Sequence, residues 1–286
     1  MRQSTLNLGG KIFSLAKPQV MGIVNVTPDS FYAGSRTDGE KALHARYQEI
    51  IAEGGTMIDL GGCSTRPGSV MPDSREEMER LRPALALWQR EYNHLPLSVD
   101  TFRADVATMA VEEYGAQIIN DIAGGTEDPL MYATVARLGV PYILMHLEGQ
   151  VGGMHVERTY TPNVETAVLD YFIQKVQTLR EMGVKDIILD PGFGFSKKAE
   201  DNYRLLAHYA SALAPLKLPI LIGVSRKRMV WQLLESSAGE ALNGTTVLHT
   251  LALLRGGADI LRVHDVRAAM ETIKLMEVMR PYLEGV

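Results

Sequence analysis

Three side chains that accept hydrogen bonds end apolar runs in this sequence. Asp100 closes the run LSVD, Asp190 closes IILD, and Asn120 follows Ile118 and Ile119. A single carboxylate at such a place usually caps the next helix. Several acceptors that converge on one cavity need hydrogen-bond donors there, because it is costly to bury a carboxylate without a partner. A flat heterocycle with a ring N–H beside an amino group offers two parallel donors. We therefore predict that Asp100, Asn120 and Asp190 bind such a ring, for example a pterin.

Cationic side chains gather near the last strand ends. Lys227 lies in the run SRKR, and Arg262 and His264 alternate with the apolar Val263. The two-residue period of a strand places Arg262 and His264 on the same face. An arginine directed into the helix layer would be costly, so we expect both side chains at the cavity, where the arginine fork suits a phosphate. The residues expected to help hold a polyanion such as diphosphate are Asn25, Thr65 and Arg66.

Other features near these residues have more than one interpretation. The segment Ser64-Thr65-Arg66-Pro67-Gly68 is typical of a surface turn and also of a loop that closes over an anion. The amide oxygen of Asn25 suits Mg²⁺, although one amide alone is a weak indication of a metal. Cys63 has no general base beside it in the sequence, so we do not expect it to be a nucleophile. His146 ends an apolar run and is either a site residue or a hydrogen-bonded structural histidine.

The elements that must position these side chains alternate along the chain. Buried parallel strands are predicted at 19–26, 57–62, 96–101, 118–122, 141–146, 186–190, 219–224 and 260–263,. Helices are predicted at 40–53, 75–92, 103–113, 129–138, 163–182, 198–213, 245–255 and 267–279,. Ser74 and Glu77 have the spacing of a capping box for the helix at 75–92.

About eight strand–helix units in 286 residues predict an α/β protein with a single-domain (β/α)8 TIM barrel,. The pterin-binding barrel domain would span 1–286, with 1–18 as an N-terminal extension. An open doubly wound sheet is the alternative, but no Gly-x-Gly-x-x-Gly turn follows the first strand. Because barrel active sites lie at the carboxyl ends of the strands, the polar residues above are expected to share one cavity.

Bulk composition excludes several classes of function. The net charge of −5 argues against a broad nucleic-acid surface,. No run approaches the roughly 20 apolar residues of a membrane span, and the first residues lack the apolar core of a signal peptide. The one cysteine cannot form an intrachain disulfide,. We expect a cytoplasmic protein with small-molecule substrates, which binds neither nucleic acid nor membrane.

Several motifs in order resemble those of the dihydropteroate synthase family, the folate-pathway enzymes that sulfonamides inhibit. They are MGIVNVTPDSF, IDLGGCSTRPG, SVDTFRADVA, IINDIAGG, DPGFGFSKKAEDNYRLL, GVSRKRM and RVHDV, and they run from about residue 20 to residue 268. The resemblance implies a homodimeric barrel. It also implies a Mg²⁺-dependent condensation of p-aminobenzoate with 6-hydroxymethyl-7,8-dihydropterin pyrophosphate, which gives 7,8-dihydropteroate and pyrophosphate.

Matching motif positions imply residue roles. The pterin would contact Asp100, Asn120, Asp190, Lys227, Gly223 and Met145. The pyrophosphate would contact Asn25, Thr65, Arg66, Arg262 and His264, with Asn25 also at the metal. The p-aminobenzoate pocket would be bordered by Thr65, Arg66, Pro67, Phe195 and Ser225. Lys227, Arg262, His264 and Arg66 would carry the catalysis.

The chain departs from the family pattern at a few positions. Cys63 stands where many members have glutamate, and Tyr32 and Ala33 follow Phe31 where many have an aspartate. Two alternatives accompany the main interpretation, namely a pterin-binding methyltransferase-type domain and a non-catalytic pterin-binding subunit. A methyltransferase would need neither the Ser-Thr-Arg-Pro-Gly loop nor the Arg262 and His264 anion site, and this chain has both. The intact set of anion-binding residues argues against a non-catalytic subunit.

Overall fold

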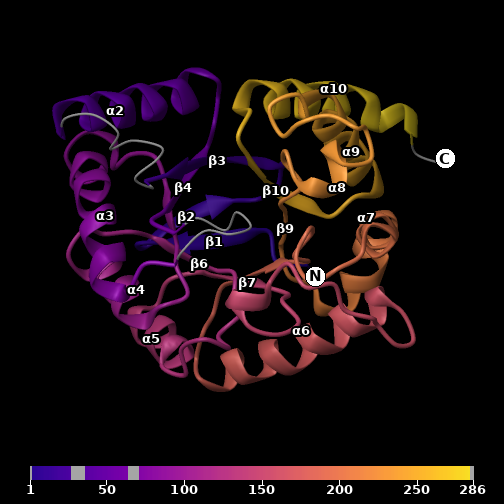
Figure 1. Cartoon of the computed structure of the whole chain (residues 1–286), viewed down its shortest axis with the longest axis horizontal. Coiled ribbons are helices and arrows are strands. Elements are labelled where there is room, and N and C mark those ends of the chain that lie inside the picture. The colour runs from indigo at the N-terminus through magenta and orange to yellow at the C-terminus, as the bar shows by residue number, and fades with distance from the viewer. Residues whose placement is uncertain (1, 27–35, 64–70, 284–286) are drawn as a thin grey trace.

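The chain forms a closed barrel of parallel strands surrounded by helices, as the sequence predicts (Figure 1). This computed structural model describes residues 2–26, 36–63 and 71–283. The strands are adjacent in the order β10, β3, β4, β5, β6, β7, β8 and β9, so the last strand of the chain closes on the first barrel strand. Every predicted strand is present, and their carboxyl ends lie at one end of the barrel.

The barrel strands are β3 (Gln19–Asn25), β4 (Met57–Gly61), β5 (Leu97–Asp100), β6 (Ile118–Asp121), β7 (Tyr142–Met145), β8 (Ile187–Asp190), β9 (Ile220–Ile222) and β10 (Ala258–Val263). The α-helices in the described ranges are α2 (Arg36–Ala52), α3 (Ser74–Leu87), α4 (Ala104–Glu112), α5 (Met131–Leu138), α6 (Val164–Glu181), α7 (Ala199–Leu213), α8 (Arg228–Trp231), α9 (Leu242–Arg255) and α10 (Val266–Leu283). A π-helical turn, η1 (Trp88–Tyr92), continues α3, and short 3-10 turns are η2 (Val151–Gly153) and η3 (Ala214–Leu216).

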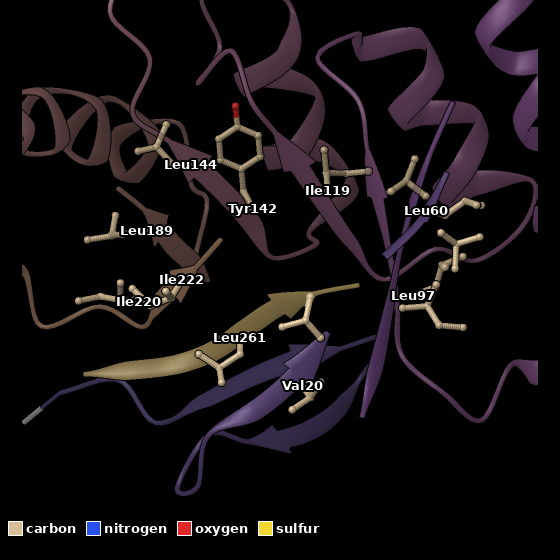
Figure 2. Close-up of a cluster of buried hydrophobic side chains, with 14 of the residues drawn as sticks. Val20, Leu60, Leu97, Ile119, Tyr142, Leu144, Leu189, Ile220, Ile222 and Leu261 are labelled. Atoms are coloured by element: carbon tan, nitrogen blue, oxygen red, sulfur yellow. The ribbon is translucent and has the colours of Figure 1, made fainter. Parts of the chain in front are cut away.

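The outward face of the barrel forms the main hydrophobic core. Alternate strand residues such as Leu60, Leu144 and Leu261 are fully buried in one cluster with apolar residues of the helices. Figure 2 shows members of this cluster on several barrel strands. Because the side chains of a strand alternate between its two faces, residues of the other parity must point into the barrel.

The amino-terminal end of the barrel is closed by a hairpin. Strands β1 (Thr5–Leu8) and β2 (Lys11–Ser14) pair antiparallel within the predicted N-terminal extension. Leu6, Leu8 and Leu15 are buried with a layer of inward-facing barrel residues that includes Met21 and Ile188. The hairpin therefore seals one end of the barrel with apolar contacts, and the polar chemistry is left to the other end.

One local prediction was wrong. The capping residue of α3 is Asp73, whose Oδ1 accepts a hydrogen bond from the Glu76 amide at 2.8 Å. Ser74 lies inside the helix and its hydroxyl donates to Asp105, while Glu77 is buried against Arg103 and is therefore not part of a capping box. No helix within the described ranges is both long enough and apolar enough to cross a membrane.

Candidate active site

A layer of polar side chains lies inside the barrel above the apolar layer. Asp59, Asp100, Asn120 and Asp190 share the inward parity of their strands, and Arg262 does so on β10,. In register, Asp100 of β5 pairs with Gly61 on one side and with Asn120 on the other. The carboxyl ends of the parallel strands therefore bring together the acids and the arginine that the sequence placed at strand ends.

Arg262 links two carboxylates across the cavity. Its Nε donates to Oδ2 of Asp59 at 2.6 Å, and its Nη2 donates to Oδ2 of Asp100 at 2.7 Å. Asp59 is fully buried, so this pairing compensates much of the cost of removing its charge from water,. Arg262 therefore faces the cavity, as the strand period predicts.

Asp59 is the site residue that our sequence reasoning missed. Its Oδ2 also accepts a hydrogen bond from Nδ2 of Asn120 at 3.0 Å. Oδ1 of Asp59 and Oδ1 of Asn120 are both buried, and neither has a hydrogen-bond partner among the described residues. An acid in the middle of the apolar run MIDLG was the available signal, because such a strand is buried on both faces and a charge in it must be paired.

Asp190 and Lys227 both have charged atoms close to Gly223. Oδ1 of Asp190 accepts a hydrogen bond from the amide of Gly192 at 2.8 Å. A Cβ placed on Gly223 would lie 3.8 Å from Oδ2 of Asp190 and 4.0 Å from Nζ of Lys227. Because glycine has no side chain, residue 223 places no side-chain atoms between the carboxylate and the ammonium.

Burial shifts the proton affinities of these groups. It raises the pKa of Asp100 to about 7, with Arg262 opposing the shift and Asp59 adding to it. It lowers the pKa of Lys227 to about 8, although Asp190 acts in the other direction. Burial also raises the pKa of Asp190. The site thus contains two acids and an amine whose pKa values are shifted, as is typical of functional sites.

His264 and Arg226 differ in their surroundings. Nδ1 of His264 lies 3.1 Å from Oγ of Ser225, which also accepts a hydrogen bond from the His264 amide. Arg226 instead forms a two-pronged ion pair with Asp265, with both contacts at 2.7 Å, and donates to backbone carbonyls. His264 and Ser225 therefore contact each other, whereas Arg226 pairs with Asp265 in the loop after β10.

The predicted contact residues Phe195 and Met145 lie in an apolar cluster at this end of the barrel. Both are buried, and Nζ of Lys227 lies 4.1 Å from the centroid of the Phe195 ring. On the other side of the site, a Cβ on Gly61 would lie 3.3 Å from Oδ1 of Asn25 and 3.4 Å from Cβ of Asp100. Asn25 therefore lies at the level of the polar layer.

Three predicted site residues, Thr65, Arg66 and Pro67, lie outside the described residues. Cys63, just before them, accepts a hydrogen bond from Arg103 at 3.7 Å, and burial together with Glu77 raises its pKa. A thiol held in its neutral form is a poor nucleophile, which agrees with the sequence interpretation.

His146 is a buried structural histidine. Its Nδ1 lies 2.9 Å from Nζ of Lys197, and burial lowers its pKa well below the usual value. Within the described ranges, no cluster of three or more His, Cys, Asp or Glu side chains has the geometry of a metal site.

Comparisons with known proteins match nearly the whole chain. A sequence model of the pterin-binding enzyme family matches residues 21–264. The dihydropteroate synthase of Bacillus subtilis (strain 168) is 40% identical over 267 residues, which cover 92% of this chain and 89% of that protein.

Solved structures agree with this assignment. The Yersinia pestis dihydropteroate synthase in a sulfonamide drug complex superposes with a TM-score of 0.87 at 36% identity, covering 97% of this chain and 99% of that one. The Xanthomonas albilineans dihydropteroate synthase with 4-aminobenzoic acid gives a TM-score of 0.85 at 35% identity, covering 97% of this chain and 98% of that one. The relatives support the synthase over the methyltransferase interpretation. Because the motifs, the barrel and these matches coincide, this chain belongs to the pterin-binding enzyme family, among its dihydropteroate synthases.

Proposed function

We propose that this chain joins p-aminobenzoate to 6-hydroxymethyl-7,8-dihydropterin pyrophosphate to give 7,8-dihydropteroate and pyrophosphate. In this reaction the methylene carbon–oxygen bond breaks and its electron pair leaves with the pyrophosphate. The amine nitrogen of p-aminobenzoate forms the new carbon–nitrogen bond and then releases a proton. Family membership and the solved complexes of the relatives support this activity for the chain.

One observation carries the residue assignment, namely the ion-paired network of Arg262. This guanidinium contacts Asp59 and Asp100 in the same polar layer that contains Asn120 and Asp190. The acids proposed to bind the ring and the arginine proposed to bind phosphate therefore belong to one layer inside the barrel, which supports the condensation. A site with the acids and the cation on opposite rims would not support this chemistry.

The pterin is proposed to lie between Asp190 and Asn120. Oδ2 of Asp190 accepts no hydrogen bond from the described residues, so a ring N–H and an amino group can supply its donors,. The unpartnered Oδ1 atoms of Asn120 and Asp59 need donors as well, because a buried acceptor without one is costly,. Lys227 would donate to an acceptor on the same ring beside Gly223.

The pyrophosphate is proposed to lie beside Arg262, His264 and Asn25. Positive charge and N–H donors at this place stabilise the charge that grows on the leaving oxygens. Mg²⁺ commonly binds one or two protein oxygens together with substrate phosphates, so the amide of Asn25 fits this ion. Mg²⁺ bound there would supply further positive charge to the leaving group. Thr65 and Arg66 stay predicted contacts of the pyrophosphate.

The amine substrate is proposed to lie against Phe195 and Ser225, with Thr65, Arg66 and Pro67 as further predicted contacts. Ser225 is buried beside His264, and Phe195 borders the apolar cluster. The amine is already a nucleophile, so positioning it near the methylene carbon is the main requirement.

A pyrophosphate-release assay with purified protein tests the proposal. Release that requires p-aminobenzoate, the pterin pyrophosphate and Mg²⁺ together is the expected result. Pterin binding without any release would favour the non-catalytic alternative, and absence of pterin binding would exclude both. The cytoplasmic location expected from the sequence stays a prediction that cell fractionation would test.

A homodimer through α9 and α10 is also proposed. These neighbouring helices lie together on the outside of the barrel (Figure 1). In α10, Leu275, Val278 and Tyr282 are 68%, 69% and 79% exposed and recur at helical spacing, and Leu251 and Leu254 of α9 are exposed too,. Apolar stripes of this kind mark protein interfaces, and a second copy of the chain is the partner that the family resemblance implies.

Sedimentation equilibrium tests the dimer. Replacing Leu275 and Val278 by glutamate is expected to produce a monomer at micromolar concentration. Ile12→Glu is the control, because Ile12 is 82% exposed on β2 and belongs to neither helix. A monomeric unaltered protein would contradict the proposal.

A further inference from the structure

Residues 191–196, a turn in the connection from β8 to α7, are arranged around the buried side chain of Lys197. Nζ of Lys197 lies 2.9 Å from Nδ1 of His146 and donates to the carbonyl oxygens of Gly192 at 3.0 Å and Phe195 at 3.2 Å. Lys197 is only 3% exposed. Its three ammonium hydrogens thus have three acceptors, and two of these acceptors belong to the turn itself.

The same turn forms one wall of the active site. The amide of Gly192 donates to Oδ1 of Asp190, and the carbonyl of Phe193 accepts a hydrogen bond from Lys227. The ring of Phe195 lies under the Lys227 ammonium. The turn therefore contacts both lysines, so the conformation that satisfies Lys197 also contacts Asp190 and Lys227.

Close packing fixes the acceptors of Lys197 in place. Gly192 has φ of +69°, and a Cβ there would lie 2.1 Å from the carbonyl oxygen of His146 and 3.3 Å from Nζ of Lys197. The backbone amide of His146 donates to the Asp190 carbonyl at 2.9 Å, and its ring packs edge-on against Tyr171. The turn can therefore close on Lys197 only with glycine at position 192.

We propose that Lys197 is a positioning residue for the pterin-binding half of the active site. Its hydrogen bonds hold the 191–196 turn in the conformation that orients the Asp190 carboxylate and places the Phe193 carbonyl and the Phe195 ring against Lys227. This inference rests on the proposed function, because it matters for activity only if Asp190 and Lys227 bind the substrate ring. Lys197 itself lies behind the turn and is not assigned a substrate contact.

The charges around the two lysines predict how pterin binding should depend on pH. Burial lowers the pKa of Lys197 to about 7, Asp190 opposes the shift, and the Lys227 charge adds to it. The titratable groups that face Lys197 from neighbouring segments are His146, Asp190, Lys227, Asp201 and Glu148. Those that face Lys227 are Asp190, Arg262, Asp100 and Lys197. Removing the Lys197 charge is therefore expected to raise the pKa of Asp190,.

The test compares Lys197→Met with Lys198→Met by titration calorimetry. Lys198 is the matched control, because it is the next residue in the chain and its side chain is exposed. The probe is 6-hydroxymethylpterin, measured from about pH 5 to about pH 9. We expect about tenfold weaker binding for Lys197→Met, the loss that corresponds to one hydrogen bond's net contribution. The acid limit of binding, where Asp190 takes up a proton, is expected to move to higher pH, while Lys198→Met behaves like the unaltered protein.

Thermal unfolding separates positioning from folding. Lys197→Met is expected to unfold in one cooperative transition, because methionine fills a similar space, and the loss of a buried charge offsets part of the cost of three acceptors left without their donor. If Lys197→Met does not fold, His146→Leu removes only one of the three acceptors and is expected to weaken pterin binding in the same sense.

The outcomes distinguish this inference from the proposed function. A folded Lys197→Met variant with unchanged pterin affinity and an unchanged pH profile overturns the positioning role, as does an equal effect of Lys198→Met. Unchanged binding in His146→Leu, where Lys197→Met does not fold, overturns it as well. Absence of pterin binding to the unaltered protein would instead refute the proposed function.

Discussion

Replacing Lys227 by methionine is expected to stabilise the fold and to weaken pterin binding at the same time. Burial lowers the pKa of this lysine from 10.5 to about 8 despite the nearby Asp190. That difference corresponds to about 3 kcal/mol by which the charged side chain disfavours the folded state. The hydrogen bond to Phe193 and the contact over the Phe195 ring offset about 1–2 kcal/mol of this,. The variant should therefore gain about 1–2 kcal/mol at pH 7.

The gain should depend on pH in a defined direction. Below pH 8, Lys227 is protonated in both the folded and the unfolded protein, and its full cost is present. Between about pH 8 and pH 10.5 the folded lysine has lost its proton while the unfolded lysine still holds it. The free energy of unfolding of the unaltered protein then rises relative to that of the variant. The advantage of Lys227→Met should accordingly shrink across this interval.

Urea unfolding at about pH 7 and about pH 10, together with calorimetric titration of a pterin, measures both effects. Lys41→Met, on the exposed surface of α2, is the control and should change neither quantity. A variant that is less stable than the unaltered protein at both pH values would refute the reasoning. A stability difference that is the same at both pH values would refute it too, because the difference would then not come from the ammonium charge.

Further changes probe the other parts of the site. Arg262→Ala should lower kcat/KM by about 10² to 10³, because it removes a donor to the charge that develops in the transition state. The loss in pterin affinity should be smaller. Equal losses in kcat/KM, from steady-state kinetics, and in pterin affinity, from calorimetry, would show that the proposed role is wrong. Asp190→Asn should weaken pterin binding by about 10- to 100-fold, because one of the two carboxylate oxygens that would accept from the ring N–H and the amino group is replaced by an NH₂ donor. Unchanged affinity in titration would contradict ring binding at this residue. Leu6→Ala should lower the free energy of unfolding, measured in urea, by about 2–4 kcal/mol, because it opens a cavity between the hairpin and the barrel,. KM should not change. A large change in KM would argue that the hairpin does more than seal the barrel.

The sequence by itself determined the barrel and the end of it that carries chemistry. Apolar runs that end in polar residues predict buried parallel strands, and every predicted strand is present because a strand buried on both faces has a simple composition,. The strand period also placed Arg262 inside the barrel correctly. Local signals were less dependable at helix ends, where Asp73 rather than Ser74 caps α3.

Tertiary structure alone decided which charges are paired. Arg262 lies 203 residues from Asp59 and 162 residues from Asp100 in the sequence, and only closure of the barrel brings them within hydrogen-bond distance. Lys197 stands just before a predicted helix, and the sequence pattern indicates no role for it. In the structure, two backbone carbonyl groups of the 191–196 turn accept hydrogen bonds from its ammonium group. The hydrophobic pattern of a sequence records which side chains leave water, whereas the partner of a buried charge depends on how distant strands and turns meet in space.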